Sequence, residues 1–363
     1  MILFRNACTR EGSRTKRLAD RLLKGLGGPV KELRICEMDL AKVDEEFLKK
    51  RDRSIAARDF SDPMFDLAKD FVSADEIVIA APYWDLSFPA ALKQFFEQIN
   101  VIDLTFTYLA EGTPKGLCRA KKLYYVQTAG GKVLSDSYGY GYVKALCDYF
   151  YGIPETVQFK AEGLDIVGAD TEAVLKKAEM EIDAYLAGEL FLELKDEEWP
   201  FEYTDHDRDV VRAVVFDDEG WFYFVHADRD DEFGRSVLIE TSGGGVEKGE
   251  DLEAAVKREL REELGAEVEI VRRIGLVSDQ YNLIHRHNLN NYYLCRAVSF
   301  GDRSLTEQEV SDYHLEIMKL TYEDALKEYE KCRGCRLGRV IAAREVPVLR
   351  KAKEILDGMR AEG

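Results

Sequence analysis

Positive charge is scarce in this chain of 363 residues, in which 51 lysines and arginines face 69 aspartates and glutamates, giving a net charge of −18. Proteins that bind nucleic acid or an anionic membrane surface need basic patches, because phosphate groups dominate both kinds of partner. The charge balance therefore argues against nucleic acid and against a membrane, and it favours small-molecule partners.

Long hydrophobic runs and a dense set of cysteines are also missing. No apolar stretch reaches the roughly 20 residues that a membrane-spanning helix needs. The apolar run at residues 1–4 is too short for a signal peptide, so we expect it to open a first strand. The seven cysteines are an odd number and are scattered along the chain. This pattern favours reduced thiols in the cytoplasm over a disulfide framework.

The chain is too long for one ordinary hydrophobic core, so two domains are expected. A polar, acidic segment with Trp199 near its centre separates two regions of regular apolar patterning. Such segments are typical of domain boundaries. The sequence therefore predicts a first domain at residues 1–190, a linker at 191–206 and a second domain at 207–363. Trp199 and Phe201 are expected to dock the linker, with an exposed partner site as the alternative.

In the first region, apolar strand patterns alternate with helical ones, and the continuous apolar run at residues 76–81 is typical of a parallel strand buried on both faces. Five such strands separated by helices predict a doubly wound α/β sheet, in which ligands bind beyond the carboxyl ends of the strands. The expected strands are residues 1–7, 30–36, 76–81, 122–127 and 157–163, and the expected helices are 13–26, 65–72, 89–99, 142–150 and 171–186.

Three loops follow these strands, and each has groups that suit a flavin phosphate ester. The first, residues 9–15, brings hydroxyl, guanidinium and amide groups to a helix N-terminus, which favours an anion. The second, residues 82–89, is aromatic and polar, and the third, residues 127–131, is a glycine-rich turn. Each loop alone is weak evidence, because a Ser or Thr before a helix is usually only an N-cap. Their joint spacing is what indicates a binding site.

These loops resemble those of the flavodoxin-like FMN oxidoreductases, the azoreductase and quinone reductase family, over roughly residues 1–186. The resemblance implies FMN as cofactor, NADH or NADPH as electron donor, a quinone, azo or nitro compound as acceptor, and a homodimer. It also implies that the first loop holds the FMN phosphate and that the second lies along the flavin ring, where Asp85 stands in place of the usual asparagine and Leu86 in place of the usual aromatic residue. The implied FMN-binding residues are Thr9, Arg10, Ser13, Thr15, Pro82, Tyr83, Trp84, Asp85, Leu86, Thr128, Gly130 and Gly131.

The second region contains an acidic helix that packing alone does not explain. Apolar residues recur at helical spacing from Asp251 to Leu264, so one face of this helix lies in a core. Glu259, Glu262 and Glu263 then share one patch about one turn long. Carboxylates placed so closely repel one another unless a cation intervenes, and oxygen ligands without Cys or His favour Mg²⁺ or Mn²⁺ over zinc.

The same stretch resembles the Nudix box, G-x5-E-x7-R-E-U-x-E-E-x-G-U with U aliphatic. Only the last aliphatic position matches weakly, because Ala266 stands where a larger aliphatic residue is usual. Just upstream of the box, Ser242 stands where many members carry proline. The residues that fall on the fixed positions are Gly244, Glu250, Arg258, Glu259, Leu260, Glu262, Glu263 and Gly265. A solvated acidic helix would have to match all of these by accident.

This resemblance implies a Mg²⁺-dependent diphosphatase acting on a nucleoside diphosphate linked to another group, folded as an α/β/α sandwich with a mixed sheet. Glu259 and Glu263 are the expected metal ligands, with Glu262 as ligand or general base. Gly243 or Gly244 could add a backbone carbonyl ligand. Arg258 can pair with Glu262 or with Glu250, which would hold the loop against the helix.

The rest of the second region predicts a hairpin, further strands and two helices. The hairpin is expected at residues 210–226, where two apolar strand patterns flank an acidic turn that contains glycine. A helix is expected at residues 322–332, and the amphipathic segment at 346–360 could cover the other domain or a dimer partner. The other expected strands are residues 236–240, 268–277 and 291–298.

Several features have weaker interpretations. Cys332 and Cys335 have the spacing of half a zinc site or a redox pair, but a turn at a helix end is favoured because no second pair exists. His285 and His287 lie in a polar stretch, residues 282–290, which is expected to be a loop over the substrate or simply solvated. Glu307 and Glu309 lie where some Nudix enzymes keep an extra metal ligand or base.

Two readings of the whole chain compete. In the first, the protein is a bifunctional enzyme whose Nudix half processes a dinucleotide such as NAD(H), FAD or ADP-ribose connected to the redox half. In the second, one or both halves are non-catalytic binding modules, because a fold alone does not imply a function.

Overall fold

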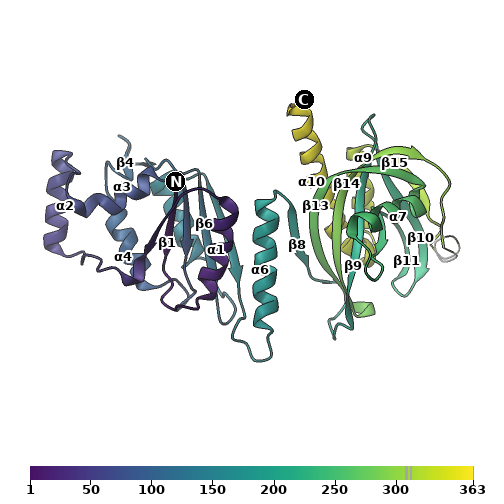
Figure 1. Ribbon diagram of the computed structural model, residues 1–363, viewed down its shortest axis with the longest axis horizontal. Coiled ribbons are helices and arrows are strands. Elements are labelled where there is room, and N and C mark those ends of the chain that lie inside the picture. Colours follow the sequence, from purple (N-terminus) through teal and green to yellow (C-terminus); the bar gives the residue numbers. More distant parts are fainter. Residues whose placement is uncertain (307–309, 311–312, 363) are drawn as a thin grey trace. The chain divides into compact units, whose positions relative to one another are not determined.

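The computed structural model describes residues 1–306, 310 and 313–362 (Figure 1). The chain forms two compact units, Met1–Leu186 and Ala187–Gly363. The segment expected to be a linker at 191–206 is partly ordered into the second unit, because Leu190–Leu194 forms strand β8 of its sheet. In the rest of this segment, Trp199 packs edge-on against the ring of Phe233, whereas Phe201 is exposed.

The first unit is built on a five-stranded sheet in the order β2-β1-β3-β6-β7. Every neighbouring pair in this sheet is parallel, so the predicted doubly wound fold is confirmed. A small antiparallel pair, β4 and β5, lies outside it. The strands are β1 (Ile2–Asn6), β2 (Val30–Arg34), β3 (Glu76–Ala80), β4 (Phe106–Tyr108), β5 (Pro114–Gly116), β6 (Lys122–Thr128) and β7 (Glu155–Ala161).

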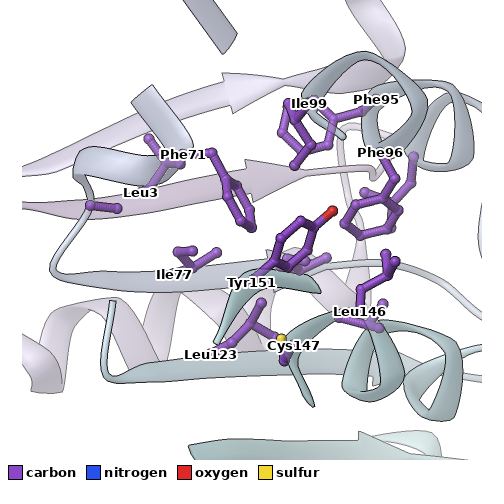
Figure 2. Close-up of a cluster of buried hydrophobic side chains, with 14 of the residues drawn as sticks. Leu3, Phe71, Ile77, Phe95, Phe96, Ile99, Leu123, Leu146, Cys147 and Tyr151 are labelled. Carbon is purple, nitrogen blue, oxygen red and sulfur yellow. The ribbon is translucent and has the colours of Figure 1, made fainter. Parts of the chain in front are cut away.

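Helices cover both faces of this sheet (Figure 1). Side chains of α3, α4 and α5 share one apolar cluster with alternate residues of β1, β3 and β6, and side chains of α1 and α6 share another with the intervening residues. Figure 2 shows the first cluster, in which the ring of Tyr151 lies 4.8 Å from that of Phe71. The helices are α1 (Arg14–Leu26), α2 (Glu45–Ala57), α3 (Asp66–Ser73), α4 (Ala90–Ile99), α5 (Tyr140–Leu146) and α6 (Thr171–Leu186).

The second unit is built on a mixed sheet whose main path runs β11-β10-β9-β14-β13-β8. Strands β9 and β14 are parallel at its centre, β12 pairs with β9, and β15 pairs with β10. The strands are β8 (Leu190–Leu194), β9 (His206–Phe216), β10 (Phe222–Asp231), β11 (Gly234–Glu240), β12 (Ser242–Gly245), β13 (Ala266–Tyr281), β14 (Arg286–Phe300) and β15 (Glu316–Leu320).

Helices pack on both faces of this sheet as well, which gives the mixed α/β fold expected of a Nudix domain. Helix α7 (Leu252–Leu264) shares a core with odd-numbered residues of β9, such as Val211. Helices α9 (Tyr322–Cys332) and α10 (Arg336–Glu362) share the other core with even-numbered residues, such as Val214.

The last helix differs from its prediction in length and in what it covers. Helix α10 begins ten residues before the predicted start at 346 and continues through Pro347, although a proline inside a helix removes one backbone hydrogen bond. Its apolar residues Val348, Leu349 and Ala352 are buried in the core of its own unit. This face therefore covers its own sheet, not the other domain or a dimer partner.

The polar stretch at residues 282–290 also differs from its prediction. Only Asn282–Ile284 forms a short helical turn, and β14 begins at Arg286, so half of the expected loop is strand. The side chains of Asn288 and Asn290 are buried and donate hydrogen bonds to Asp279 on β13. Strand pairing tolerates these polar residues because their amides find buried partners.

Candidate functional site

Helix α7 is fixed at both ends and along one face. Its N-cap residue, Asp251, accepts hydrogen bonds from two backbone N–H groups of the first turn. Gly265 ends the helix in the left-handed conformation at φ 63°, which glycine adopts without steric cost. Ala255, Val256 and Leu260 are fully buried against the sheet. This anchoring holds the acidic face of the helix beside the glycine strand β12.

Arg258 ties the helix to the preceding loop. Its guanidinium donates two hydrogen bonds of 2.9 Å to the carboxylate of Glu250 and one of 3.1 Å to the carbonyl of Gly245. It also donates to Glu259 at 2.8 Å and to Glu262 at 3.1 Å. The two partners expected for Arg258, Glu250 and Glu262, are therefore both bound at once. Since the bidentate pair with Arg258 favours the ionised carboxylate, it lowers the pKa of Glu250 to about 2.

Glu263 is the one buried carboxylate of the acidic patch, with 8% of the residue exposed. Its Oε2 accepts a hydrogen bond of 2.6 Å from the hydroxyl of Ser242 and one of 2.9 Å from the backbone N–H of Gly243. Burial raises the pKa of this carboxyl to about 7, against the opposing effect of the two hydrogen bonds. Ser242, where proline is usual, thus donates a hydrogen bond that proline could not.

This raised pKa predicts that Glu263 makes the unfolding free energy depend on pH. Below about pH 4.5 the carboxyl is protonated in both the folded and the unfolded chain, and above about pH 7 it is ionised in both. Between these values only the unfolded chain loses the proton, so stability falls as the pH rises, by on the order of 3 kcal/mol. We expect Glu263→Gln to remove this component, so that the variant gains stability over the wild type between pH 5 and pH 8.

Urea unfolding of both proteins in EDTA at a series of pH values measures this difference. Glu253→Gln, at an exposed position of the first turn of the same helix, should show no such trend. A constant difference between Glu263→Gln and the wild type across the range would contradict the assignment.

The acidic patch opens onto a cavity of about 740 Å³. Glu259, Glu262 and Glu263 line it together with Gly243 and Gly244 of β12. A side chain at Gly244 would put its Cβ 2.5 Å from the Glu259 carboxylate, so this carboxylate lies directly against the glycine backbone. The expected ligand residues therefore share one cavity, and all of them offer oxygen donors, which suit Mg²⁺ or Mn²⁺.

Their present arrangement is that of an ion-pair network. Among the residues that the structure describes, no three His, Cys, Asp or Glu side chains are grouped as a metal site. Glu259 and Glu262 are both turned toward Arg258. Glu307 and Glu309, the weaker candidates for a further ligand or base, lie outside the described residues.

Other polar groups that line this cavity were missed by the sequence analysis. They come from the even-numbered side of two central strands and from their neighbours, and they were hidden because Arg and Asn inside strands look like solvent-facing positions. They are Arg208, Arg212, Arg229, Glu240 and Asn288, with Arg286 at the start of β14.

A second cavity, of about 240 Å³, lies at the carboxyl ends of β1, β3 and β6 in the first unit. All three predicted loops contribute to it. The hydroxyls of Thr15 and Thr128 lie 2.6 Å apart and join the first loop to the third, and Ser13 caps helix α1. The predicted residues that line the cavity are Thr9, Arg10, Ser13, Thr15, Pro82, Tyr83, Trp84, Thr128 and Gly130.

Asp85, Leu86 and Gly131 are not among the lining residues. Trp84 and Ser87 exchange two backbone hydrogen bonds, and Asp85 and Leu86 between them have φ of 50° and 68°. This is a tight hairpin turn with two left-handed residues, a conformation that aspartate tolerates better than leucine. The turn presents Trp84 to the cavity and leaves Leu86 exposed.

The structure adds an ion pair that the sequence analysis did not assign. Arg14 donates to the carboxylate of Asp165 at 2.7 Å and to the carbonyl of Leu164 at 3.2 Å. Asp165 also lies against Gly130, where a Cβ would be 2.4 Å from its Oδ2. These residues and Gly12 complete the rim of the cavity. Asp165 could not be identified from the sequence because it lies in the loop after β7, far from the other lining residues.

The minor candidates have structural explanations. All seven cysteines are free, and Cys335 lies in the turn between α9 and α10, where its thiol accepts from the backbone N–H of Gly338. His287 lies between Asp207 and the hydroxyl of Ser278, both at 2.7 Å. His285 stacks on the ring of Tyr203. In the described part of the chain, no helix is both long and apolar enough to cross a membrane.

The two folds define a two-domain protein that joins a doubly wound parallel α/β domain to a mixed-sheet domain with an acidic helix. The family model for the flavodoxin-like fold matches residues 2–186, and that for the NUDIX domain matches residues 206–332. The chain therefore belongs to the flavodoxin-like family over its first half and carries a NUDIX domain in its second.

Named relatives match the first half of the chain. An FMN-dependent NADH:quinone oxidoreductase of Lachnoclostridium phytofermentans is 36% identical over 173 residues, which cover 46% of this chain and 86% of that protein. One of Coprothermobacter proteolyticus is 32% identical, covering 49% of this chain and 92% of that protein. Among solved structures, an azoreductase from Bacillus anthracis has a TM-score of 0.45 at 20% identity, covering 52% of this chain and 98% of its own.

Proposed function

We propose that the second unit is a Mg²⁺-dependent hydrolase of a nucleoside diphosphate linked to another group. The observation that carries this proposal is the shared cavity, in which the carboxylates of α7 meet the glycine backbone of β12 on one side and several arginines of the sheet on the other. Acidic groups that can hold a cation, next to basic groups that can hold phosphate, suit a diphosphate bridged to a metal.

The residues of this chain have distinct parts in that reaction. Glu259 and Glu263 are the proposed ligands, Glu262 is a further ligand or the general base, and Gly243 or Gly244 can add a carbonyl. A bound Mg²⁺ would neutralise the diphosphate and activate water for in-line attack. Glu250 holds Arg258, which in turn positions Glu259 and Glu262. The greater exposure of Glu262 suits the role of general base, since its side chain is 42% exposed and that of the proposed ligand Glu259 is 13% exposed.

A hydrolysis screen of the full-length protein with Mg²⁺ tests this function. The panel comprises nucleotide sugars, dinucleotides including NADH, FAD and ADP-ribose, and nucleoside triphosphates, with released phosphate or monophosphate as the readout. We expect turnover of at least one diphosphate-linked compound. No turnover of any compound, with Mg²⁺ or with Mn²⁺, would reject the proposal.

For the first unit we propose FMN-dependent oxidation of NADH or NADPH with a quinone, azo or nitro compound as acceptor. The convergence of the three predicted loops on one cavity at the carboxyl edge of the sheet carries this proposal. Ser13, Thr15 and Arg10 would hold the phosphate at the N-terminus of α1, and Tyr83 and Trp84 would lie along the flavin ring. A homodimer and a cytoplasmic location remain part of this proposal.

FMN binding is expected to depend on the first loop. Purified protein should be yellow or take up added FMN, and Arg10→Ala with Ser13→Ala should weaken FMN binding by about tenfold or more, because charge-assisted phosphate contacts are lost. Lys24→Ala, at the other end of α1, is the control. Fluorescence titration of FMN measures the affinities. A colourless protein that does not bind added FMN would reject the proposal and leave this unit as a scaffold.

A further inference from the structure

Two arginines in the cavity of the second unit have no hydrogen-bond acceptor among the residues that the structure describes. Arg208 on β9 and Arg286 on β14 both line the cavity, and within the described part of the chain neither makes a hydrogen bond or an ion pair. They lie close enough for the positive charge of Arg286 to lower the pKa of Arg208, after the larger effect of burial. Glu259 opposes this repulsion at Arg208 by its negative charge, but it also pairs with Arg258. An anion in the cavity would therefore stabilise the two neighbouring guanidinium groups further.

Arg208 lies at the end of the cavity where the glycine strand β12 meets the acidic patch of α7. A Cβ at Gly245 would lie 2.6 Å from one of its guanidinium nitrogens, so the side chain crosses directly over the glycine strand. The carbonyl of Gly245 accepts from Arg258, whose guanidinium binds Glu259 and Glu262. Arg208 therefore lies next to the acidic patch. From there it can bind the phosphate groups of a substrate whose diphosphate is held by a metal at that patch.

Beside Arg208 on the neighbouring strand, Asn288 offers a buried acceptor. Asn288 is the register partner of Arg208, lines the cavity, and is 6% exposed. Its Nδ2 donates to the carboxylate of Asp279 at 3.2 Å, whereas its Oδ1 has no partner among the described residues. Because a carboxylate can only accept, the amide nitrogen must face Asp279 and the oxygen must face the other way.

A buried network holds this orientation. Asp279 also accepts from the amide of Asn290 at 2.9 Å and from the guanidinium of Arg344 at 3.0 Å. Arg344 is fully buried and fixes the position of this carboxylate from the side opposite Asn288 and Asn290, through the second carboxylate oxygen. The free acceptor on Asn288 is therefore fixed before any ligand arrives, and an unpaired buried acceptor selects for a ligand that brings a donor.

We propose that Arg208, Arg286 and Asn288 form a sugar-phosphate subsite, in which the two guanidinium groups bind phosphate oxygens and Asn288 Oδ1 accepts a hydrogen bond from a hydroxyl of the adjoining sugar. This assignment rests on the proposed hydrolase function and narrows its substrate class to nucleoside diphosphates joined to a hydroxylated sugar. A phosphate alone would leave Asn288 unpaired, and a neutral sugar would leave the arginines unpaired.

Binding measurements on the full chain in EDTA test the subsite without hydrolysis. The probes are inorganic phosphate, ribose 5-phosphate, AMP and ADP-ribose, titrated by calorimetry or by ligand-observed NMR. We expect ribose 5-phosphate to bind more tightly than phosphate. Arg208→Ala and Arg286→Ala should each weaken all four probes, by about tenfold for ADP-ribose. Arg235→Ala, an exposed arginine on β11, is the control and should change nothing.

Asn288→Ala should weaken ribose 5-phosphate and ADP-ribose about three- to tenfold and leave inorganic phosphate unchanged. The proposal is overturned if this variant binds ribose 5-phosphate as the wild type does, or if it affects AMP but not ribose 5-phosphate, which would assign the donor to the base. If Asn288→Ala does not fold, the two arginine variants still test the proposal. Unchanged binding of inorganic phosphate by both Arg208→Ala and Arg286→Ala would contradict the subsite. If the protein binds these probes as expected but hydrolyses none of the compounds in the screen, the hydrolase function is rejected and the subsite is not.

Discussion

Glu262→Gln and Glu263→Gln should each lower hydrolysis of a diphosphate-linked nucleotide by about 100-fold or more, while the chain stays folded. A carboxamide is a poorer ligand for Mg²⁺ and cannot act as a general base. The two residues differ in their surroundings, since the side chain of Glu262 is 42% exposed whereas Glu263 is buried under Gly243. Loss of activity at both positions therefore points to the shared cavity.

Steady-state rates at saturating Mg²⁺, with circular dichroism as the folding check, measure this effect. Glu253→Gln on the same helix is the matched control, because its side chain is exposed and does not line the cavity. Undiminished turnover in both Glu262→Gln and Glu263→Gln would contradict the assignment of helix α7 to the reaction centre.

Arg344→Met should destabilise the second unit by about 3–5 kcal/mol, since removing one partner of a buried ion network leaves the other charges uncompensated. The side chain of Arg344 is fully buried. It donates to Asp279 at 3.0 Å, to Glu240 at 3.0 Å and to the hydroxyl of Tyr281 at 2.8 Å. Methionine fills much of the space but takes the cation away from three carboxylates, those of Asp279, Glu240 and Glu345. Among the described residues, only Glu240 keeps another ion-pair partner, since Arg212 lies 3.4 Å away.

Urea unfolding followed by the fluorescence of Trp199 and Trp221 reports on this unit. The control is Arg339→Ala on the same helix, whose ion pair with Glu198 is partly exposed and should contribute about 1 kcal/mol or less. Equal stabilities for the two variants would show that the Arg344 network does not hold the fold. Arg344→Met should also weaken the binding of ribose 5-phosphate. Without Arg344 the carboxylate of Asp279 is no longer fixed, and it therefore no longer orients the amide of Asn288.

The fold and the acidic helix were predictable because their signals are local. The five parallel strands follow from apolar runs such as residues 76–81, and the carboxylates of α7 follow from helical spacing within a single turn. Arg258 illustrates the limit of such spacing, since the sequence left two partners open and the structure pairs it with both Glu250 and Glu262.

The remaining parts of the sites depend on contacts between residues far apart in the chain. Strand β14 begins earlier than predicted because the amide nitrogen of Asn288 finds an acceptor in Asp279 on the neighbouring strand, which no local pattern reveals. Arg208 and Arg286 are 78 residues apart and meet only through the parallel pairing of β9 and β14. Asp85 and Leu86 were assigned to the flavin site from a resemblance, and their left-handed turn keeps them out of the cavity lining.

The most direct test of the central claim is metal removal from the second unit during turnover. Hydrolysis of the compound found in the screen is followed before EDTA, after EDTA, and after Mg²⁺ is added back, in the wild type and in Glu259→Gln. We predict that EDTA abolishes wild-type turnover, that Mg²⁺ restores it, and that Glu259→Gln needs a higher Mg²⁺ concentration for half-maximal rate. Turnover that persists unchanged in EDTA would contradict the account.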